Sequence, residues 1–342
     1  MSRTAVLLAA VLTLAACSPP DEGTADAGGT RVEGPATSSG DVPRTVRQDL
    51  VEVPDRGEAS IRADLDLGLG TVRAGRAERG TLFQAEVSLP VDGLRADLRT
   101  ETIPTERGEQ ARIHLSLAGD AASPTDLDRT RGLAWRLLFS HETPLDLSVR
   151  MGAAEADLDL TGVPLRRLAV TCGVAKTALR LRSPNPEAAA DVEIRAGVSE
   201  FTGVGLGHLR ARRFRFEGGV GRFALDFSGA APEPGAEASL RVGVGELAVT
   251  LPTGVPFVLE APGGRLSAIE LPPGLVTLGQ GRYATPGAPP DAFTVRISSG
   301  PGRVVVRYSG APPPPPAPPP PPAPPAPPPP PAPLAPPAPP AP

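Results

Sequence analysis

The chain has 342 residues, with 34 Lys and Arg against 38 Asp and Glu and a formal net charge of −4. Because no basic block stands out, the sequence argues against a nucleic-acid partner. Aromatic residues make up 4% of the chain, which argues against a groove that stacks sugars or single-stranded bases. A signal-like N-terminus and two low-complexity stretches leave roughly 250 residues to fold, enough for one large domain or a repeat array.

The N-terminus has the pattern of an export signal. Arg3 supplies a short positive region, and residues 5–16 form an uncharged apolar run. This run is too short to span a bilayer as a helix, which takes about 20 residues, but it suits the apolar region of a signal peptide. It ends in Leu14-Ala15-Ala16-Cys17, which resembles the lipobox of bacterial lipoproteins. Residues 1–16 are therefore predicted to be a lipoprotein signal peptide.

The resemblance to a lipobox implies that Cys17 becomes the first residue of the mature chain and carries the lipid. Two or three acyl chains would hold the protein on a membrane, at about 0.8 kcal/mol per buried CH₂ group. Ser18 stands where many lipoproteins retained at the inner membrane have Asp, so the resemblance favours the outer membrane if the organism is Gram-negative. The alternative is a plain secretory signal with an incidental cysteine.

Two low-complexity segments flank the part expected to fold. Residues 17–57 are rich in Gly, Ser, Thr, Pro and acidic residues without apolar periodicity, which predicts a flexible, disordered linker. Residues 311–342 contain only Pro, Ala and Leu334. Because this tail has few backbone N–H donors, it is predicted to form polyproline II. It could thread through the cell wall, dock on a partner, or be an unselected extension.

Residues 58–310, between these segments, repeat a short pattern. Each copy contains a glycine flanked by alternating apolar residues, and from Gly152 to Gly243 these glycines recur about every 20 to 25 residues, a spacing typical of a solenoid. The copies begin at Leu65, Leu145, Leu168, Val192, Phe214, Leu240 and Phe293. The predicted corner glycines are Gly68, Gly152, Gly173, Gly197, Gly219, Gly243 and Gly300.

Each copy is predicted to be a strand, a glycine corner and a second strand. In the copy that starts at Leu145, apolar and polar residues alternate before Gly152 and again from Ala156 onward. This period of two places one face of each strand in a core and the other in water. Glycine at the corner permits a positive φ or the close approach of a neighbouring copy. The predicted fold is all-β, a single-domain β-solenoid of stacked, glycine-cornered rungs.

A charged residue lies three positions after the glycine in six copies. This column could form a ligand-binding stripe. Its mixed signs favour instead a solvated ladder, which would keep the outer face soluble and discourage edge pairing. The members of the column are Glu155, Lys176, Glu200, Arg222, Glu246 and Arg303.

Two further features fit an all-β chain. Cys172 alternates with Leu168 and Val170, which predicts a buried apolar thiol rather than a reactive one. Helix is expected to be nearly absent, because the best candidate, Thr125–Ser140, lacks a sustained helical period. That stretch could equally end in a strand at Trp135–Phe139.

Several of these segments together resemble the toast-rack domain of bacterial envelope proteins. The segments are 135–137, 143–149 and 152–162, and residues 218–229 are similar to that family's recurring G-x-G-x-h-x-h-x-h-S-G rung, where h is apolar. Related domains occur at the C-terminus of cell-wall-active antibiotic response proteins and in adhesin-like β-solenoids. The resemblance covers roughly residues 57–310 and implies a β-solenoid without known catalytic residues. Residues 172–176 and 198–200 lack the second glycine, which puts the corner geometry there in doubt.

A search for catalytic or metal-binding motifs finds little. The three histidines, His114, His141 and His208, each stand alone, without a second ligand at metal-binding spacing. Asp157 and Asp159 lie two apart on one strand and could serve glycoside hydrolysis, but simple alternation also produces such a pair. No catalytic residue, metal or small-molecule cofactor is therefore predicted.

Three functions stay open. The pattern favours a non-catalytic envelope scaffold, held on the membrane by its N-terminal lipid, that presents a surface to cell-wall polymer or to envelope proteins. The antibiotic-response relatives imply a second possibility, a regulatory partner in envelope-stress signalling. The third is a carbohydrate-active enzyme, against which the shortage of aromatic and clustered acidic residues counts.

Overall fold

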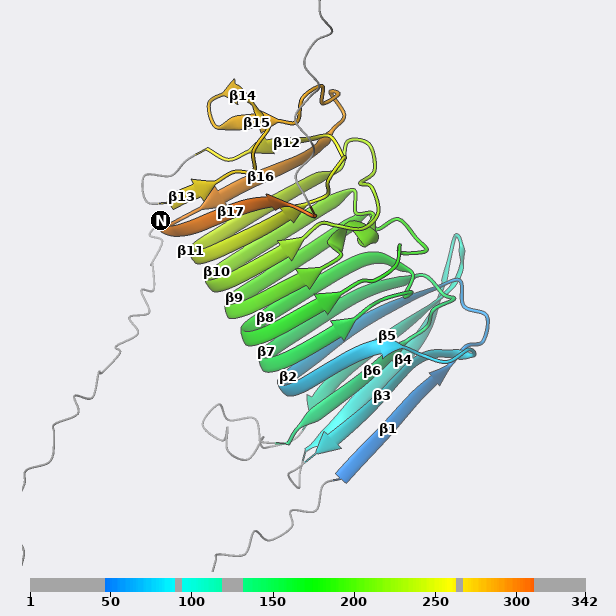
Figure 1. The fold of residues 1–342 in the computed structure, drawn as a ribbon. Coiled ribbons are helices and arrows are strands. Elements are labelled where there is room, and N and C mark those ends of the chain that lie inside the picture. Colours follow the sequence, from blue (N-terminus) through cyan, green and yellow to red (C-terminus); the bar gives the residue numbers. More distant parts are fainter. Residues whose placement is uncertain (1–46, 90–93, 119–131, 263–266, 311–342) are drawn as a thin grey trace, which may run out of the picture. The chain divides into compact units, whose positions relative to one another are not determined.

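A computed structural model describes residues 47–89, 94–118, 132–262 and 267–310 (Figure 1). The chain divides into two units, Met1–Pro43 and Arg44–Pro342, and every described residue belongs to the second. The described residues form one sheet of 17 strands, and their only helix is a 3₁₀ turn, η1 (Leu206–Leu209). None of their helices is long and apolar enough to cross a membrane. The predicted all-β fold is confirmed.

Six long strands form the middle of the sheet, and neighbouring ones pair in parallel and in register. They are β2 (Ser60–Arg76), β7 (Leu145–Asp159), β8 (Leu165–Arg180), β9 (Asp191–Val204), β10 (Arg213–Asp226) and β11 (Glu237–Leu251). We call each a rung. The prediction placed two strands around each glycine, whereas each rung is one continuous strand that bends there. We call its parts before and after the bend the first arm and the second arm.

Each end of the sheet replaces the rung by two separate strands. Beside β2, its first arm pairs with β5 (Gly108–Ala118) and its second arm with β6 (Ala134–Phe139), both in parallel. Antiparallel strands follow: β4 (Arg95–Thr105) on β5, β3 (Thr81–Leu89) on β6, and β1 (Arg47–Pro54) on β3.

The opposite end is built in the same way. The first arm of β11 pairs with β16 (Phe293–Ser299) and its second arm with β17 (Gly302–Tyr308). Next come β12 (Phe257–Glu260) on β16 and β13 (Ser267–Glu270) on β17, again in parallel. An antiparallel pair, β14 (Val276–Gly279) and β15 (Arg282–Ala284), then adds to β12.

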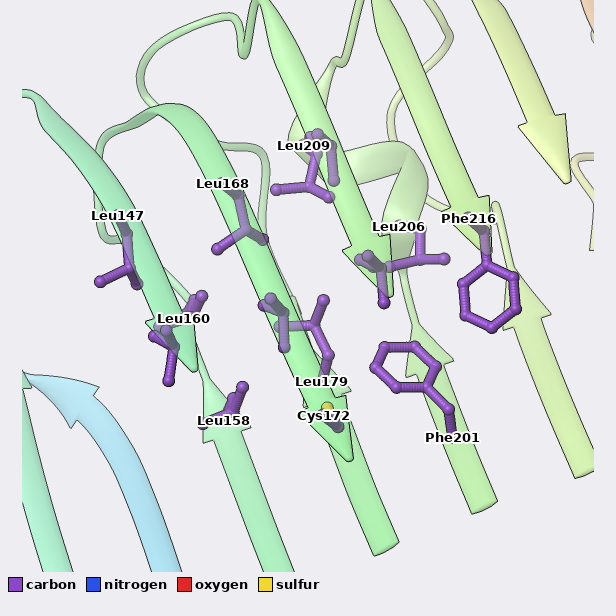
Figure 2. Packing of buried hydrophobic residues seen from close by; sticks show 14 of the residues in the cluster. Leu147, Leu158, Leu160, Leu168, Cys172, Leu179, Phe201, Leu206, Leu209 and Phe216 are labelled. Carbon is purple, nitrogen blue, oxygen red and sulfur yellow. The ribbon is translucent and has the colours of Figure 1, made fainter. Parts of the chain in front are cut away.

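The core fills the space between the two arms of the rungs. In β7 every second side chain of each arm is buried, and this alternation breaks at the bend, as expected when both arms turn one face inward. Figure 2 shows Leu147 and Leu168 of the first arms together with Leu158 and Leu179 of the second arms between the ribbons. Phe216 contributes its ring to the same cluster and stacks edge-on against Phe223 at a centroid distance of 5.3 Å.

Cys172 lies in this core with 3% of its surface exposed. Burial raises the pKa of its thiol, an effect that a contact with the Thr177 hydroxyl, at 3.5 Å, partly offsets. The predicted buried thiol is confirmed.

One predicted boundary is wrong. The linker was expected to reach residue 57, but Arg47–Pro54 forms β1, paired with β3 along its length. This strand lies at the edge of the sheet and alternates exposed with half-buried residues, so it lacks the strongly apolar face by which a strand is recognised. The rest of the linker, the signal peptide with Cys17, and the proline-rich tail lie outside the described residues.

The expectation of little helix also holds for the candidate at Thr125–Ser140, as far as it is described. Its last part is strand β6, with Trp135 buried and its indole nitrogen donating a hydrogen bond to the Leu69 carbonyl oxygen at 3.1 Å. Residues 125–131 lie outside the described residues.

Candidate functional site

The bends of the rungs lie one above another, and a column of glycines makes this stacking possible. A Cβ atom added to Gly152, Gly173, Gly197, Gly219 or Gly243 would lie 2.6 to 2.8 Å from the carbonyl oxygen of the corner glycine on the preceding rung. At Gly300 the approach is closer still. Side chains are excluded there because neighbouring backbones meet, not because φ is positive. Gly68 differs: its φ is +59°, and the pairing of β2 with β7 shifts register beside it.

A row of valines stands on the outside of the bend. Each follows the corner glycine of its rung, and cross-strand pairing aligns all four. Their exposed fractions are 63%, 58%, 49% and 45%, in the order Val174, Val198, Val220 and Val244. We call this row the valine ridge. Contiguous exposed apolar side chains of this kind usually mark a surface that another molecule covers.

The predicted column of charges runs beside the ridge, two residues further along each rung. Its members pair in register with one another, all are exposed, and their signs alternate without a break. We call this column the charge ladder: Glu155, Lys176, Glu200, Arg222, Glu246 and Arg303. The prediction of an exposed ladder of mixed signs is confirmed.

Most charges of the ladder have no ionic partner. Within the described part of the chain, only Arg303 forms a salt bridge, to Glu270 on β13. Some charges elsewhere on the outer face are bound: Arg180 holds Asp157, and Arg213 holds Asp191 through two hydrogen bonds. An incoming partner would therefore reach the other five ladder charges without first breaking a salt bridge to them.

The ridge and the ladder form the two walls of a shallow recess of about 480 Å³. Small residues line its floor, among them Ala154, Ala175 and Gly221. The Ser199 hydroxyl also lines it, buried and without a hydrogen-bond partner. A second, more polar recess of about 400 Å³ continues onto the second arms, bounded by residues such as Arg73.

The residues considered for catalysis are not brought together. His114 lies on β5, His141 in the turn after β6, and His208 in η1, and no group of three possible metal ligands occurs among the described residues. Asp157 is bound to Arg180, and Asp159 accepts a hydrogen bond from the Thr161 hydroxyl at 2.5 Å. These two carboxylates are thus engaged in structural contacts.

The sequence analysis missed the valine ridge. The signal was present, because a Gly-Val pair recurs at 173–174, 197–198, 219–220 and 243–244. Alternation alone does not show that the residue after each bend faces outward, since the bend shifts the inward and outward pattern.

The fold defines the class of this protein as a β-solenoid of bent parallel rungs. Residues 42–203 match the family described as the N-terminal domain of toast_rack, DUF2154. The segment is thus similar to a toast-rack N-terminal domain, which confirms the predicted resemblance. The rungs beyond residue 203 continue the same register.

Two solved structures show limited similarity. A "putative cell adhesion protein" from Clostridium sporogenes shares 15% identity, with a TM-score of 0.42, over 77% of this chain and 100% of the other. A "putative adhesin" from Bacteroides fragilis shares 12% identity, with a TM-score of 0.31, over 77% of this chain and 97% of the other. No curated protein matches the chain.

Proposed function

We propose that this protein is a non-catalytic lipoprotein of the cell envelope that binds envelope or cell-wall components through the outer surface of the bends. We call this surface, which carries the valine ridge and the charge ladder, the bend face. The observation that carries the proposal is the pairing of two continuous exposed columns, the valine ridge and the charge ladder, on one stack of rungs. Apolar contact with unpaired charges beside it is the composition of a recognition surface. The carboxylates that a hydrolase would need are instead bound to neighbouring side chains.

The attachment to the membrane rests on the sequence of residues 1–18. A lipid on Cys17, followed by a linker, would hold the folded part near the membrane surface without a transmembrane helix. Changing Cys17→Ser should leave unprocessed or mis-sorted protein. A Cys17→Ser chain that still partitions with membranes as the unchanged chain does would contradict the anchor.

The binding surface is tested by site-specific photo-crosslinking in intact cells. A photoreactive amino acid at Val198, on the ridge, should form defined adducts with envelope proteins or with wall fragments that lysozyme releases. The matched control is Val276 on β14, which is exposed to a similar degree, 47%, but lies away from the bend. Equal adducts from both positions would contradict a binding role for the bend face.

The tail is a separate part of the proposal. A stiff proline-rich segment suits passage through the wall mesh or docking on an aromatic-lined groove of a partner. Deleting residues 311–342 should leave the thermal melt of the solenoid unchanged and alter its surface exposure or its crosslinked partners. An unchanged exposure and partner set would remove the tail from the proposed function.

A further inference from the structure

The charge ladder and the valine ridge share one centre. The ladder has six members on β7, β8, β9, β10, β11 and β17, and the ridge has four on β8 to β11. The midpoint of both sets falls between β9 and β10. Because the ladder alternates in sign and has an even number of members, a charge on one side of this midpoint always matches an opposite charge at the same distance on the other side.

This arrangement of opposite charges about the midpoint determines which face-to-face pairing of two copies of the chain is favourable. A two-fold axis parallel to the stack would place each ladder member opposite its own equivalent, so that like charges meet. A two-fold axis parallel to the rungs reverses the ladder and places every charge opposite a charge of the other sign. Complementary charge of this kind selects partner and register more than it adds affinity.

We propose that the bend face binds a second copy of this chain, about a two-fold axis that runs parallel to the rungs between β9 and β10. The inference rests on the proposed function, because it names a partner of the same surface. In this arrangement Glu200 faces Arg222 of the partner subunit, and Lys176 faces Glu246 of the partner subunit. Each pairing occurs twice, as in any interface built on a two-fold axis.

The valines follow the same symmetry. Val198 faces Val220 of the partner subunit, and Val174 faces Val244 of the partner subunit. The most exposed apolar side chains of the middle rungs are thereby covered, and each charged pair borders an apolar contact that excludes water. At the two ends of the ladder Glu155 faces Arg303 of the partner subunit; these pairs contribute least, because Arg303 already binds Glu270.

The neighbouring outward column leaves room for a partner to approach. It consists of small residues on four consecutive rungs, aligned in register: Ala178, Thr202, Ala224 and Ala248. No bulky side chain of the second arms therefore stands above the ladder at its centre.

The size of the surface predicts a weak dimer. Rungs about 4.8 Å apart make the ladder about 24 Å long, and columns two residues apart lie about 7 Å from each other. The ridge, the ladder and the column of small residues beside it thus cover a patch of about 14 by 24 Å. The contact is on the order of 300 Å² per copy, less than half of the roughly 800 Å² typical of a stable complex. Such a dimer forms at high local concentration, the condition that anchoring on a membrane would provide.

Cysteine crosslinking of the full-length chain in detergent tests the register. Val174→Cys and Val244→Cys proteins, carrying different tags, should form disulfide-linked dimers when mixed and mildly oxidised. Neither protein alone should do so, because equivalent positions lie three rungs, or about 14 Å, out of register, beyond the roughly 7 Å that a disulfide spans. A mixture of Val244→Cys with Val276→Cys is the control for random collision, and the unchanged chain is the control for native cysteines.

Charge reversal tests the same contact without cysteine. Glu200→Arg alone should weaken self-association about tenfold, since two attractive contacts become repulsive. Adding Arg222→Glu should restore it, although like charges then become neighbours within each chain. If the alternating charges only stabilised each chain internally, the double variant would self-associate no better than Glu200→Arg alone. Unchanged circular dichroism and thermal melts would show that both variants fold.

The outcomes separate this inference from the proposed function. Crosslinking of the mixture together with rescue by the double variant supports the dimer. Crosslinking of Val174→Cys with itself, or no crosslinking above the collision control, overturns it. If the dimer fails while a photoreactive group at Val198 still captures other envelope components, the proposed function stands without self-association. If Val198 captures only a second copy, the dimer stands and the broader binding role fails.

Discussion

In the middle of the sheet, β7 to β11 pair in parallel along both arms, whereas at its two ends separate, shorter strands take the place of the rungs and antiparallel pairs appear. Parallel, in-register pairing places equivalent residues of successive rungs next to each other. One exposed valine or glutamate per rung thus becomes a continuous surface column. The middle therefore shows, and the ends do not, that repetition of the rungs in register builds the proposed binding surface as well as the core.

The ends have a different requirement, because their edge strands must not pair with strands of another chain. Most side chains of β4 are exposed, and its Arg99 and Asp97 bind each other along the same strand. β1 begins with a charged residue and ends at Pro54, which cannot donate a backbone hydrogen bond. Charged and proline-containing edges of this kind discourage pairing with another chain.

The largest expected contrast between middle and ends concerns the core. Phe223→Asp on β10 should lower the free energy of unfolding by about 4 kcal/mol or more, since it buries an unpaired charge in place of a ring that is 2% exposed. Leu50→Asp on β1, where the side chain is 65% exposed, should change it by about 0.5 kcal/mol or less. Urea denaturation measures both. Similar losses would mean that the middle is not the main source of stability.

Backbone contact at the bend should give the next largest effect. Gly197→Ala would place a Cβ atom 2.6 Å from the Gly173 carbonyl oxygen, so a rung must shift, at a cost of about 2 to 3 kcal/mol. Gly75→Ala is the matched control, because β2 meets β6 there and the nearest atom, Leu138 Cδ2, lies at an ordinary 3.6 Å. Thermal denaturation should show a clear loss for the first variant and almost none for the second. A tolerated Gly197→Ala would contradict tight stacking at the bend.

Connections outside the rungs should rank third. Asn185 is 2% exposed, accepts a hydrogen bond from the Leu165 backbone nitrogen at 3.0 Å and donates one to the Leu165 carbonyl oxygen at 2.7 Å. Asn185→Ala removes the donor to the buried Leu165 carbonyl oxygen, although the Leu165 nitrogen keeps a hydrogen bond to the Val163 carbonyl oxygen at 2.9 Å, and should cost about 2 kcal/mol. At the end of the sheet, Thr285 accepts one hydrogen bond from the Phe257 backbone nitrogen at 3.1 Å, and Thr285→Val should cost about 1 kcal/mol. If urea denaturation showed a larger loss of stability for Thr285→Val than for Asn185→Ala, the end loop would be the more rigid connection.

The sequence predicts the middle of the sheet far better than its ends, for a physical reason. In the middle, each rung carries its own alternation and its own glycine, so local pattern and tertiary pairing agree. The charge ladder follows directly, because equal spacing after the glycine becomes equal position once the rungs stack in register.

The ends depend on long-range pairing that local patterns do not encode. β2 lies between β7 and the pair β5 and β6, although β5 and β6 lie between β2 and β7 in the chain. Strands as short as β13 and β15 carry too few residues for a period of two to be recognised. The valine ridge was missed for a third reason: its exposure depends on the exact place of the bend, which a period of two does not reveal.

The smallest expected effect concerns ion pairs on the outer face. Arg213 on β10 donates two hydrogen bonds to Asp191 on β9, at 2.6 and 3.0 Å, and this contact holds the pKa of the Asp191 carboxyl below its ordinary value. A pKa lower in the folded than in the unfolded chain means that the contact stabilises the fold above the unfolded pKa, near pH 4. That contribution is lost as the pH falls through the lower, folded pKa. Both side chains are partly exposed, so solvent screening keeps the contribution small.

Asp191→Asn should therefore lower the urea midpoint slightly at pH 7, by less than any destabilising variant above, and the difference from the unchanged chain should vanish once the pH has fallen below the lowered pKa of Asp191 in the folded chain. Asp97→Asn at the end of the sheet is the control, because Asp97 binds Arg99 two residues away on the same strand. That contact joins no two strands, and the unfolded chain can form it too, so its loss should leave the midpoint unchanged. If Asp97→Asn shifted the midpoint as much as Asp191→Asn, pairing between rungs would have no advantage over pairing within a strand. If the effect of Asp191→Asn did not depend on pH, it would reflect packing at the β9–β10 contact rather than charge.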